Sequence, residues 1–392
     1  MSLPFGDDFL KFWIPGVALV ACLACPAGHS ESPDIERAIE WARTLEAQGR
    51  LPEATEAWQA VIQRSPSSVP ALSGLGVLLA RQGKYQEAIG AYRKALAIDP
   101  DIFEIQMNLG LAYFKMGNFR AAKEPLRAAQ ALAPSNAQVK ILLGMSNYGD
   151  GNYGEAAHQL EAASAAQPGN VEMLRMLAES LLWSGEYPKA LDVYRPLLER
   201  EPESAAVHML AGQAFDGLGR HDEAIAEFET AVKNGPREPN VHFGLGYLYW
   251  KQRRYEDAAR EFHTELANDP QNYQALAYLG DTEMRREGNS EAAAHLEKAL
   301  KLRPDIRIAN LDLGIIRSAR REYDAAVAHL ERAIRLDPRR SDAHYRLAGV
   351  WKSMGKNREA AAEYVKVKQL QSQENEDLLL KISGPPSKPT IQ

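Results

Sequence analysis

Cysteine is nearly absent from this 392-residue chain: its two cysteines, Cys22 and Cys25, both lie near the amino terminus. Their CxxC spacing occurs in redox and metal sites, but no second pair exists to complete such a site, and a pair inside an apolar leader is a poor candidate. The rest of the chain has no cysteine and hence no disulfide. We therefore expect packing alone to hold the fold together.

Motifs of catalytic sites are missing as well. The sequence has no HExxH, no glycine-rich phosphate loop and no nucleophile elbow. His208, His242 and His344 share one position of the repeat described below, so they cannot converge on one metal ion. The carboxylates recur on solvent faces at the period of the repeat. We expect no enzyme, no metal site, no cofactor and no small-molecule substrate.

A strong excess of one charge is also missing. The formal net charge is −6 and 25% of the residues are charged, which argues against a nucleic-acid partner. Basic residues do recur near the turns of neighbouring repeats, but acidic residues interleave with them. We expect a solvated edge there, with an anionic partner as the alternative. The basic residues are Lys251, Arg253, Arg254, Arg285, Arg286, Arg320 and Arg321.

The apolar run at the amino terminus is short. Residues 12–25 form a stretch of 14 mostly apolar residues, too short to span a bilayer comfortably but typical of a signal-peptide core. The sequence Leu19-Val20-Ala21-Cys22 is similar to a bacterial lipobox, which implies that Cys22 is lipidated and begins the mature chain. We therefore expect an exported protein on the periplasmic side of the bacterial envelope, tethered to the membrane through Cys22.

Other features of the leader leave alternatives open. Asp7 and Asp8 stand beside a single Lys11, where positive charge should dominate, and Pro15-Gly16 interrupts the apolar run. The alternatives are a signal peptide cleaved near Ala24 or Ala27, an uncleaved anchor, no export, or a misassigned start methionine.

The strongest feature that is present is a period of 34 residues. Nine prolines follow one another at this spacing, which indicates one helical hairpin stacked many times, a solenoid rather than a compact globule. These prolines are Pro66, Pro100, Pro134, Pro168, Pro202, Pro236, Pro270, Pro304 and Pro338.

Ten repeats follow from Ile35 to Glu374 when the period proline is counted as position 32. Position 20 is alanine in all ten repeats, position 8 is always glycine or alanine, and position 24 is always large. Small residues at 8 and 20 let the two helices of a repeat approach closely, and the large residue at 24 fills the space beside them. Glycine at position 15 of seven repeats predicts a left-handed residue after the first helix.

These positions resemble a known family. Leu75-Gly76, Tyr85, Ala88, Tyr92 and Pro100 resemble the tetratricopeptide repeat signature, and ten repeats agree in phase. The resemblance implies an all-α fold, a right-handed superhelical solenoid of antiparallel helix pairs whose first helices line a concave groove. The domains would be a leader and linker at 1–30, the array at 31–374, and a capping helix with a disordered tail at 375–392.

Some repeats depart from the pattern. Arg253, Glu287 and Arg321 replace the turn glycine in three consecutive repeats, and we expect those turns to be less well capped. Pro125 and Pro196 lie within second helices, where proline should kink or loosen the helix. The last second helix could run on or could break near residue 375 into a separate cap, because no proline follows it until residue 385.

The resemblance also implies which residues line the groove, at positions 2, 5, 6, 9, 12 and 13 of the first helices (the inner-face positions). Methionine adapts to varied partners and aromatic side chains anchor them, so these positions predict a groove for an apolar peptide or helix. The alternative is packing on neighbouring helices or in an oligomer. The candidate residues are Met107, Asn108, Leu111, Phe114, Met145, Tyr148, Met176, Glu179, Trp183, Met209, Gln213, Phe243, Tyr247, Trp250, Tyr278, Asp281 and Met284.

Together these features predict a non-enzymatic scaffold that binds a partner protein through its concave face, in the assembly of an envelope complex. A chaperone-like holdase for exported clients is one alternative. A regulatory subunit of a separately encoded enzyme is the other.

Overall fold

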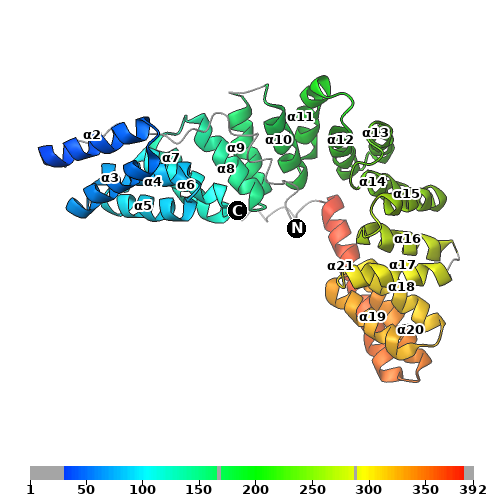
Figure 1. The fold of residues 1–392 in the computed structure, drawn as a ribbon. Helices are drawn as coiled ribbons and strands as arrows, with labels where there is room; N and C mark the ends of the chain where they lie inside the picture. Colours follow the sequence, from blue (N-terminus) through cyan, green and yellow to red (C-terminus); the bar gives the residue numbers. More distant parts are fainter. Residues whose placement is uncertain (1–30, 166–168, 287–288, 384–392) are drawn as a thin grey trace, which may run out of the picture. The chain divides into compact units, whose positions relative to one another are not determined.

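The computed structural model describes residues 31–165, 169–286 and 289–383, without the side chains of residues 289, 290 and 374–383. The described residues form twenty α-helices and no strand, and successive helices pack as pairs (Figure 1). Each repeat supplies one pair, which confirms the predicted all-α solenoid of helix pairs.

The helix bounds follow the 34-residue period. The first helices are α2 (Pro33–Ala47), α4 (Val69–Arg81), α6 (Phe103–Lys115), α8 (Ala137–Gly149), α10 (Val171–Trp183), α12 (Ala205–Gly217), α14 (Val241–Lys251), α16 (Tyr273–Arg285), α18 (Arg307–Ala319) and α20 (Ser341–Ser353). The second helices are α3 (Leu51–Arg64), α5 (Tyr85–Ile98), α7 (Phe119–Leu132), α9 (Tyr153–Ser164), α11 (Tyr187–Arg200), α13 (His221–Asn234), α15 (Tyr255–Asn268), α17 (Asn289–Leu302), α19 (Tyr323–Leu336) and α21 (Asn357–Ser383).

The chain forms two compact parts, an N-terminal part that ends at Pro202 and a C-terminal part that begins at Glu203. The first five helix pairs, α2 to α11, belong to the N-terminal part, and α12 to α21 belong to the C-terminal part. Each part has its own apolar core. Tyr92 lies in a core of the N-terminal part, and Phe228 and Phe262 lie in one of the C-terminal part.

Small residues at position 8 let the two helices of a repeat touch, as the sequence predicts. A Cβ atom added to Gly110 would lie 2.5 Å from Cγ of Leu126, the position-24 residue of the same repeat. Gly212 has the same relation to Phe228, with a contact of 2.5 Å to Cδ2. No side chain fits between these helices, and interiors this tightly packed tolerate little extra volume.

The turn between the two helices requires a left-handed residue. Seven of these turns have a glycine with φ between 71° and 82°, as predicted. Arg253 and Arg321 adopt the same conformation, with φ of 59° and 63°. We expected these turns to be less well capped, and for the hydrogen bond that closes them this is wrong. Arg254 N donates to Tyr249 O at 2.9 Å, just as Lys84 N donates to Leu79 O in a turn that has glycine. Glu287 lies outside the described residues.

The two prolines inside second helices do not end them. Helix α7 is continuous through Pro125, and α11 is continuous through Pro196. Proline removes one backbone donor at each site without interrupting the helix.

The last helix takes one of the two forms that the sequence leaves open. Helix α21 runs from Asn357 to Ser383 in one piece, so no separate cap begins at residue 375 and the expected boundary after residue 374 falls inside a helix. Residues 1–30, with Cys22, and residues 384–392 lie outside the described part. Within the described residues, no helix combines the length and apolar character needed to cross a membrane.

Candidate functional site

The inner-face residues of the N-terminal part are mostly buried. Seven of the nine candidates there have exposed fractions of no more than 8%. The reason is that neighbouring first helices contact each other, α6 with α8 and α8 with α10, so side chains at these positions are enclosed between them. The expectation that they present an open apolar surface is therefore wrong, and the packing alternative holds. The buried candidates are Met107, Asn108, Leu111, Phe114, Met145, Tyr148 and Met176.

Two candidates on α10 differ from these seven. Trp183 is 55% exposed, and its ring centre lies 6.2 Å from that of Tyr153. Glu179 is half-buried and accepts a hydrogen bond of 2.5 Å from the Tyr148 hydroxyl. Burial raises the pKa of the Glu179 carboxyl, and this hydrogen bond opposes the shift. Trp183 alone of the candidates in this part is widely open to solvent.

Four half-buried aromatic residues gather on the inner-face positions of the C-terminal part; we name them the aromatic cluster. Phe243, Tyr247 and Trp250 follow one another along α14, and Tyr278 comes from α16. Tyr247 stacks on Trp250 with ring centres 5.9 Å apart and an interplanar angle of 18°. Tyr278 meets the Trp250 ring edge-on at 5.0 Å. The stacked and edge-on arrangements hold the rings in place while part of each remains exposed.

The remaining candidates of this part surround the cluster. Met209 packs against the core that contains Phe228, and Met284 against the core of the next repeats. Gln213 is half-buried, and Asp281 is buried, with an exposed fraction of 1%. Asp281 was expected to line the partner groove, but its carboxylate already accepts hydrogen bonds from within the chain.

Asp281 is held by three donors. Trp250 Nε1 donates to its Oδ2 at 2.5 Å, and Arg285 donates through Nε at 2.6 Å and through Nη2 at 3.0 Å. These bonds fix the orientation of the Trp250 indole and of the guanidinium beside it. The carboxylate therefore ties the aromatic cluster to α16.

A pocket of about 520 Å³ opens beside the aromatic cluster, between residues of α14, α16, α18 and the start of α20. Trp250 and Tyr278 form one wall, and apolar Ile308 and Leu311 also line it. Burial raises the pKa of Tyr278 to about 12, so its hydroxyl remains protonated at neutral pH. The volume is within the range of small-ligand and side-chain sites, roughly 300–1,000 Å³.

Four arginines line this pocket, and each has an acidic partner. Besides the Arg285–Asp281 pair, Arg303 Nε lies 3.1 Å from Asp305 and its Nη1 donates to the Tyr273 hydroxyl at 2.8 Å. Arg307 and Arg340 both pair with the Asp342 carboxylate. Each arginine of the lining thus has an acidic partner within the protein, although Arg307 and Arg340 share one carboxylate.

Asp312, on α18, is the lining residue that the sequence reasoning missed. Its exposed fraction is 2%, and its Oδ2 has no hydrogen-bond partner among the residues that the structure describes. Burial raises the pKa of its carboxyl well above the usual range. The neighbouring Asp281 adds to this effect through its charge and through a side-chain hydrogen bond with Asp312, and Arg285 opposes it. The sequence does mark Asp312 as unusual. It lies at position 6 of its repeat, and that position is apolar, glycine or tyrosine in the five preceding repeats.

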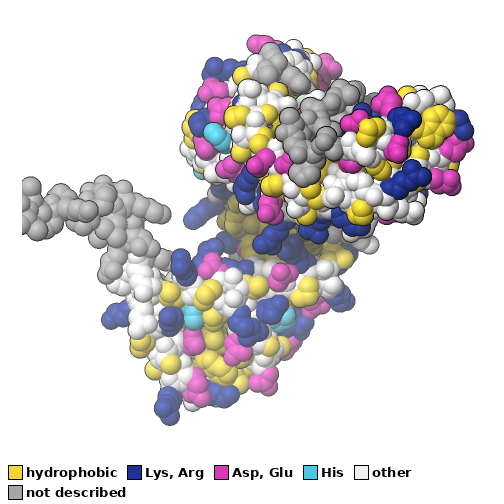
Figure 2. Space-filling view, turned by 90° about the vertical axis from the view of Figure 1, so that its left-hand side faces the viewer, with side chains coloured by type: hydrophobic (Ala, Val, Ile, Leu, Met, Phe, Trp, Pro, Cys, Tyr) yellow, Lys and Arg dark blue, Asp and Glu magenta, His cyan; other side chains and the backbone are white. Residues whose placement is uncertain are grey.

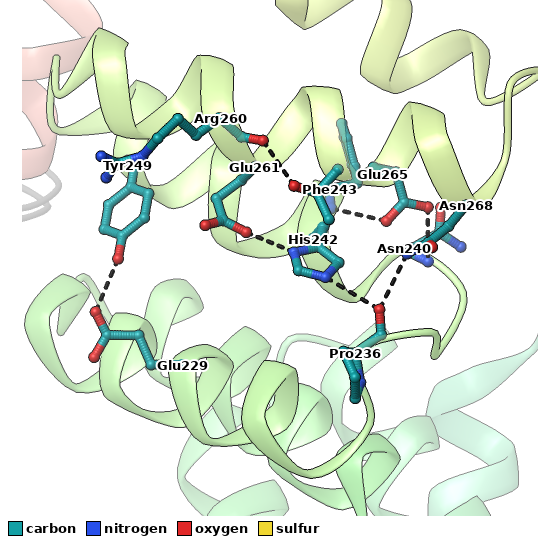
Figure 3. A network of polar contacts seen from close by, with 11 residues as sticks. Glu229, Pro236, Asn240, His242, Phe243, Tyr249, Arg260, Glu261, Glu265 and Asn268 are labelled. Carbon is teal, nitrogen blue, oxygen red and sulfur yellow. Dashed lines mark hydrogen bonds and ion pairs between the residues drawn. The ribbon is translucent and has the colours of Figure 1, made fainter.

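The aromatic cluster depends on how α14 begins. This helix starts late, after Pro239 and a left-handed Asn240, and has no side-chain cap of its own. Glu265 of α15 supplies the acceptor instead (Figure 3), because the backbone N–H groups of Asn240 and Phe243 both donate to its carboxylate at 3.1 Å. Asn272 Nδ2 donates to the same group at 3.0 Å. A carboxylate at a helix N-terminus is favourably placed for the helix dipole.

Three histidines make the same contact with a glutamate, each within its own repeat. His242 Nδ1 lies 2.6 Å from Glu261, and its Nε2 lies 3.1 Å from the Pro236 carbonyl (Figure 3). His208 with Glu227, and His344 with Glu363, repeat the same contact at 2.7 and 2.6 Å. In the described ranges no three such side chains are grouped as metal ligands would be.

Four of the seven basic residues near the turns, including Arg285, have acidic partners. Lys251 Nζ lies 2.5 Å from Asp216, Arg254 Nε donates to Asp257 at 2.8 Å, and Arg286 lies 3.4 Å from Glu256. Basic and acidic side chains are interspersed on the molecular face shown in Figure 2. The expected interleaving of charge at this edge is present in the folded chain.

Comparison with known sequences identifies the repeat. A family profile described as tetratricopeptide repeat matches residues 39–101, 141–195, 175–239, 243–305 and 311–373, and a second profile with the same description matches residues 79–145. No curated protein matches the sequence.

Several solved structures are similar to the chain. The crystal structure of the APC/C hetero-tetramer Cut9–Hcn1 aligns at 12% identity over 86% of this chain and 87% of that chain, with a TM-score of 0.46. The structure of Naa15/Naa10 bound to HypK-THB aligns at 17% identity over 86% of this chain and 64% of that chain, with a TM-score of 0.45. The human IFIT1 dimer with m7Gppp-AAAA aligns at 20% identity over 84% and 80%, with a TM-score of 0.41.

Proposed function

The chain belongs to the tetratricopeptide repeat family, and on that premise we propose that it is a non-enzymatic scaffold that binds an apolar peptide or helix of a partner protein at the aromatic cluster. The observation that carries the proposal is the cluster itself: four half-buried aromatic side chains beside a pocket of about 520 Å³. Aromatic anchors next to a pocket are the usual centre of a protein interface.

The state of these rings supports binding over packing. Phe243, Tyr247, Trp250 and Tyr278 are already ordered by contacts with one another. A partner that covers them would bury apolar area and lose little side-chain entropy, because few rotamers remain to be fixed. The inner-face positions of the N-terminal part offer no comparable surface, since most of them are buried.

The proposed place of action is the periplasmic side of a bacterial envelope, with Cys22 as a lipid tether and the assembly of an envelope complex as the task. Its support is the leader sequence, in which an apolar stretch is followed by a lipobox-like Leu-Val-Ala-Cys. The test is fractionation of cells that produce the wild type and Cys22→Ala. A variant that stays in the membrane fraction as fully as the wild type refutes the tether.

The binding proposal is tested by affinity capture with the full chain and a Tyr247→Ser, Trp250→Ser variant. The matched control is Trp41→Ser, Trp183→Ser, because these tryptophans are 56% and 55% exposed and belong to the N-terminal part. Circular dichroism establishes that both variants remain folded. We expect one stoichiometric partner that is lost from the cluster variant and kept by the control.

Other outcomes decide against the scaffold. Capture that is the same for all three proteins removes the aromatic cluster as the binding site. Many weakly bound clients in place of one partner would indicate the holdase. An enzymatic activity that co-purifies and survives replacement of every histidine of this chain would indicate the regulatory subunit.

A further inference from the structure

The pocket beside the aromatic cluster carries a surplus of positive charge. The charged residues of its lining are four arginines and four aspartates. Two of these acids, Asp281 and Asp312, are hydrogen-bonded to each other, and two carboxyl groups can form such a bond only when one of them holds a proton. The proton is on Asp312, because Asp281 already accepts hydrogen bonds from Trp250 and Arg285. Four guanidinium groups of the lining therefore face three carboxylates.

The surplus charge lies at Arg340. Arg307 and Arg340 share the carboxylate of Asp342. Arg307 makes the closer contact and its side chain is 17% exposed, whereas Arg340 lies 3.4 Å from the carboxylate and its side chain is 60% exposed. Charge-assisted hydrogen bonds between such groups are about 2.7–2.9 Å long, and a guanidinium has several N–H donors. Arg340 can therefore bind a second acceptor without giving up Asp342.

The charge of Arg340 acts on the aromatic cluster. It opposes the rise in pKa that burial causes at the Tyr278 hydroxyl. That hydroxyl remains protonated at neutral pH, since its pKa is about 12, and it can donate a hydrogen bond. Both residues line the pocket together with Trp250. The pocket thus offers a cation and a neutral donor beside the aromatic rings.

From this arrangement we infer that the pocket receives the carboxylate of a glutamate or aspartate side chain from the partner segment, with Arg340 and the Tyr278 hydroxyl as its donors. The inference deepens the proposed scaffold function and rests on it, because it names the residue that enters beside the aromatic anchors. Ile308 and Leu311 line the pocket and suit the methylene groups of such a side chain. A surplus of one positive charge matches a carboxylate better than a phosphate group, which carries a charge of about −1.5 to −2 at pH 7. A cationic side chain would add to the surplus.

The probes are acetylated and amidated alanine pentapeptides with a central glutamate, glutamine or arginine, and inorganic phosphate. The blocked ends leave the central side chain as the only charge of each peptide. The readout is the indole N–H signal of Trp250 in NMR spectra of the full chain, because this group donates to Asp281 at the pocket wall. We expect saturable shifts with the glutamate peptide, an affinity at least tenfold lower for the glutamine peptide and for phosphate, and no saturation with the arginine peptide.

Two substitutions assign the effect to the proposed donors. Arg340→Gln should lower the affinity for the glutamate peptide at least tenfold and leave that for the glutamine peptide unchanged. Tyr278→Phe keeps the ring and removes the hydroxyl, and should lower the affinity for the glutamate peptide about threefold to tenfold. The matched control is Arg335→Gln, which should leave both affinities unchanged. The side chain of Arg335 is also 60% exposed and lies 3.9 Å from an acid, Glu331, but it is not part of the pocket lining.

Several results would overturn the inference. These are binding of the glutamine peptide, the arginine peptide or phosphate as tightly as the glutamate peptide, glutamate binding that survives Arg340→Gln, and no shift with any peptide. The capture experiment above is independent of these measurements. A partner that depends on the aromatic cluster while the glutamate peptide fails to bind would leave the scaffold standing and remove the carboxylate site. A glutamate peptide that binds through Arg340 without such a partner would do the reverse.

Discussion

Two turns of the array store backbone strain that a single substitution should relieve. Arg253 and Arg321 have φ values of 59° and 63°, where seven other repeats have glycine. Both side chains are exposed, and the backbone bonds that close the turns, such as Arg254 N to Tyr249 O, remain at 2.9 Å. We predict that Arg253→Gly and Arg321→Gly each stabilise the folded chain.

The expected gain follows from two opposing terms. A left-handed conformation costs an L-residue roughly 1–2 kcal/mol, which glycine avoids. Glycine also makes the unfolded chain more flexible, which lowers stability by about 0.5–1 kcal/mol. The difference between the middles of these two ranges is a net gain of about 0.75 kcal/mol at each site, or about 1.5 kcal/mol for the double variant, because the sites are two repeats apart and should be additive.

The measurement is urea unfolding followed by far-ultraviolet circular dichroism, with the midpoint as the readout. Arg320→Gly is the matched control: this exposed arginine precedes Arg321 and has an ordinary φ of −80°. Glycine there should lower the midpoint, because it adds flexibility to the unfolded chain and relieves no strain. The reasoning fails if Arg321→Gly unfolds at the same or lower urea than wild type, or if Arg320→Gly gains as much.

Two further predictions concern buried carboxylates. Glu265→Ala should destabilise the C-terminal part by about 2–4 kcal/mol, because it leaves two N–H groups at the start of α14 without their charged acceptor. The control is Glu256→Ala, an exposed change on the same helix, which should change the free energy of unfolding by no more than about 0.5 kcal/mol in chemical denaturation. The hydrogen bond to Glu283 raises the pKa of His295 in the folded chain. This bond therefore stabilises the fold fully below the ordinary histidine pKa of about 6.5, and the stabilisation is lost as the pH rises through the folded-state pKa. The stability difference between wild type and His295→Gln should therefore be larger in acid than above neutrality, and a difference independent of pH would refute this.

The sequence predicted the repeated elements well, because each repeat tests the same packing rule again. The contact of Gly110 with Leu126, and that of Gly212 with Phe228, follow from small and large residues at fixed positions. The left-handed turns follow from glycine at position 15. These features are local to one helix pair, so the spacing along the chain determines them.

The inner face was predicted less well, because its exposure is not a property of one repeat. Whether Met107 or Met145 meets solvent depends on how closely the next first helix approaches, and the spacing within a repeat does not contain this distance. In the N-terminal part the approach is close and both are buried. Tyr247 and Trp250 stand at the same repeat positions as the buried Met145 and Phe114, yet their rings are only half-buried.

The two most informative residues of the C-terminal part are single departures from the repeat, and the structure separates their roles. Glu265 stands where six other repeats have alanine, and three donors on α14 and α16 use its carboxylate. Asp312 is equally buried, yet its Oδ2 accepts no hydrogen bond, and the hydrogen-bond partner of its carboxyl is another acid, Asp281. A buried acid whose oxygens all have hydrogen-bond donors is expected to stabilise the fold. A buried acid with an oxygen that lacks a donor is expected to destabilise it.

This difference can be measured on the free protein. Replacing an unsatisfied buried polar group by an apolar one of similar size is nearly neutral or stabilising, whereas removing a satisfied charge destabilises. Asp312→Leu should therefore unfold at the same or higher urea concentration than wild type, while Glu265→Ala unfolds at a lower one. A loss of stability in Asp312→Leu as large as that in Glu265→Ala would mean that Asp312 is a structural residue.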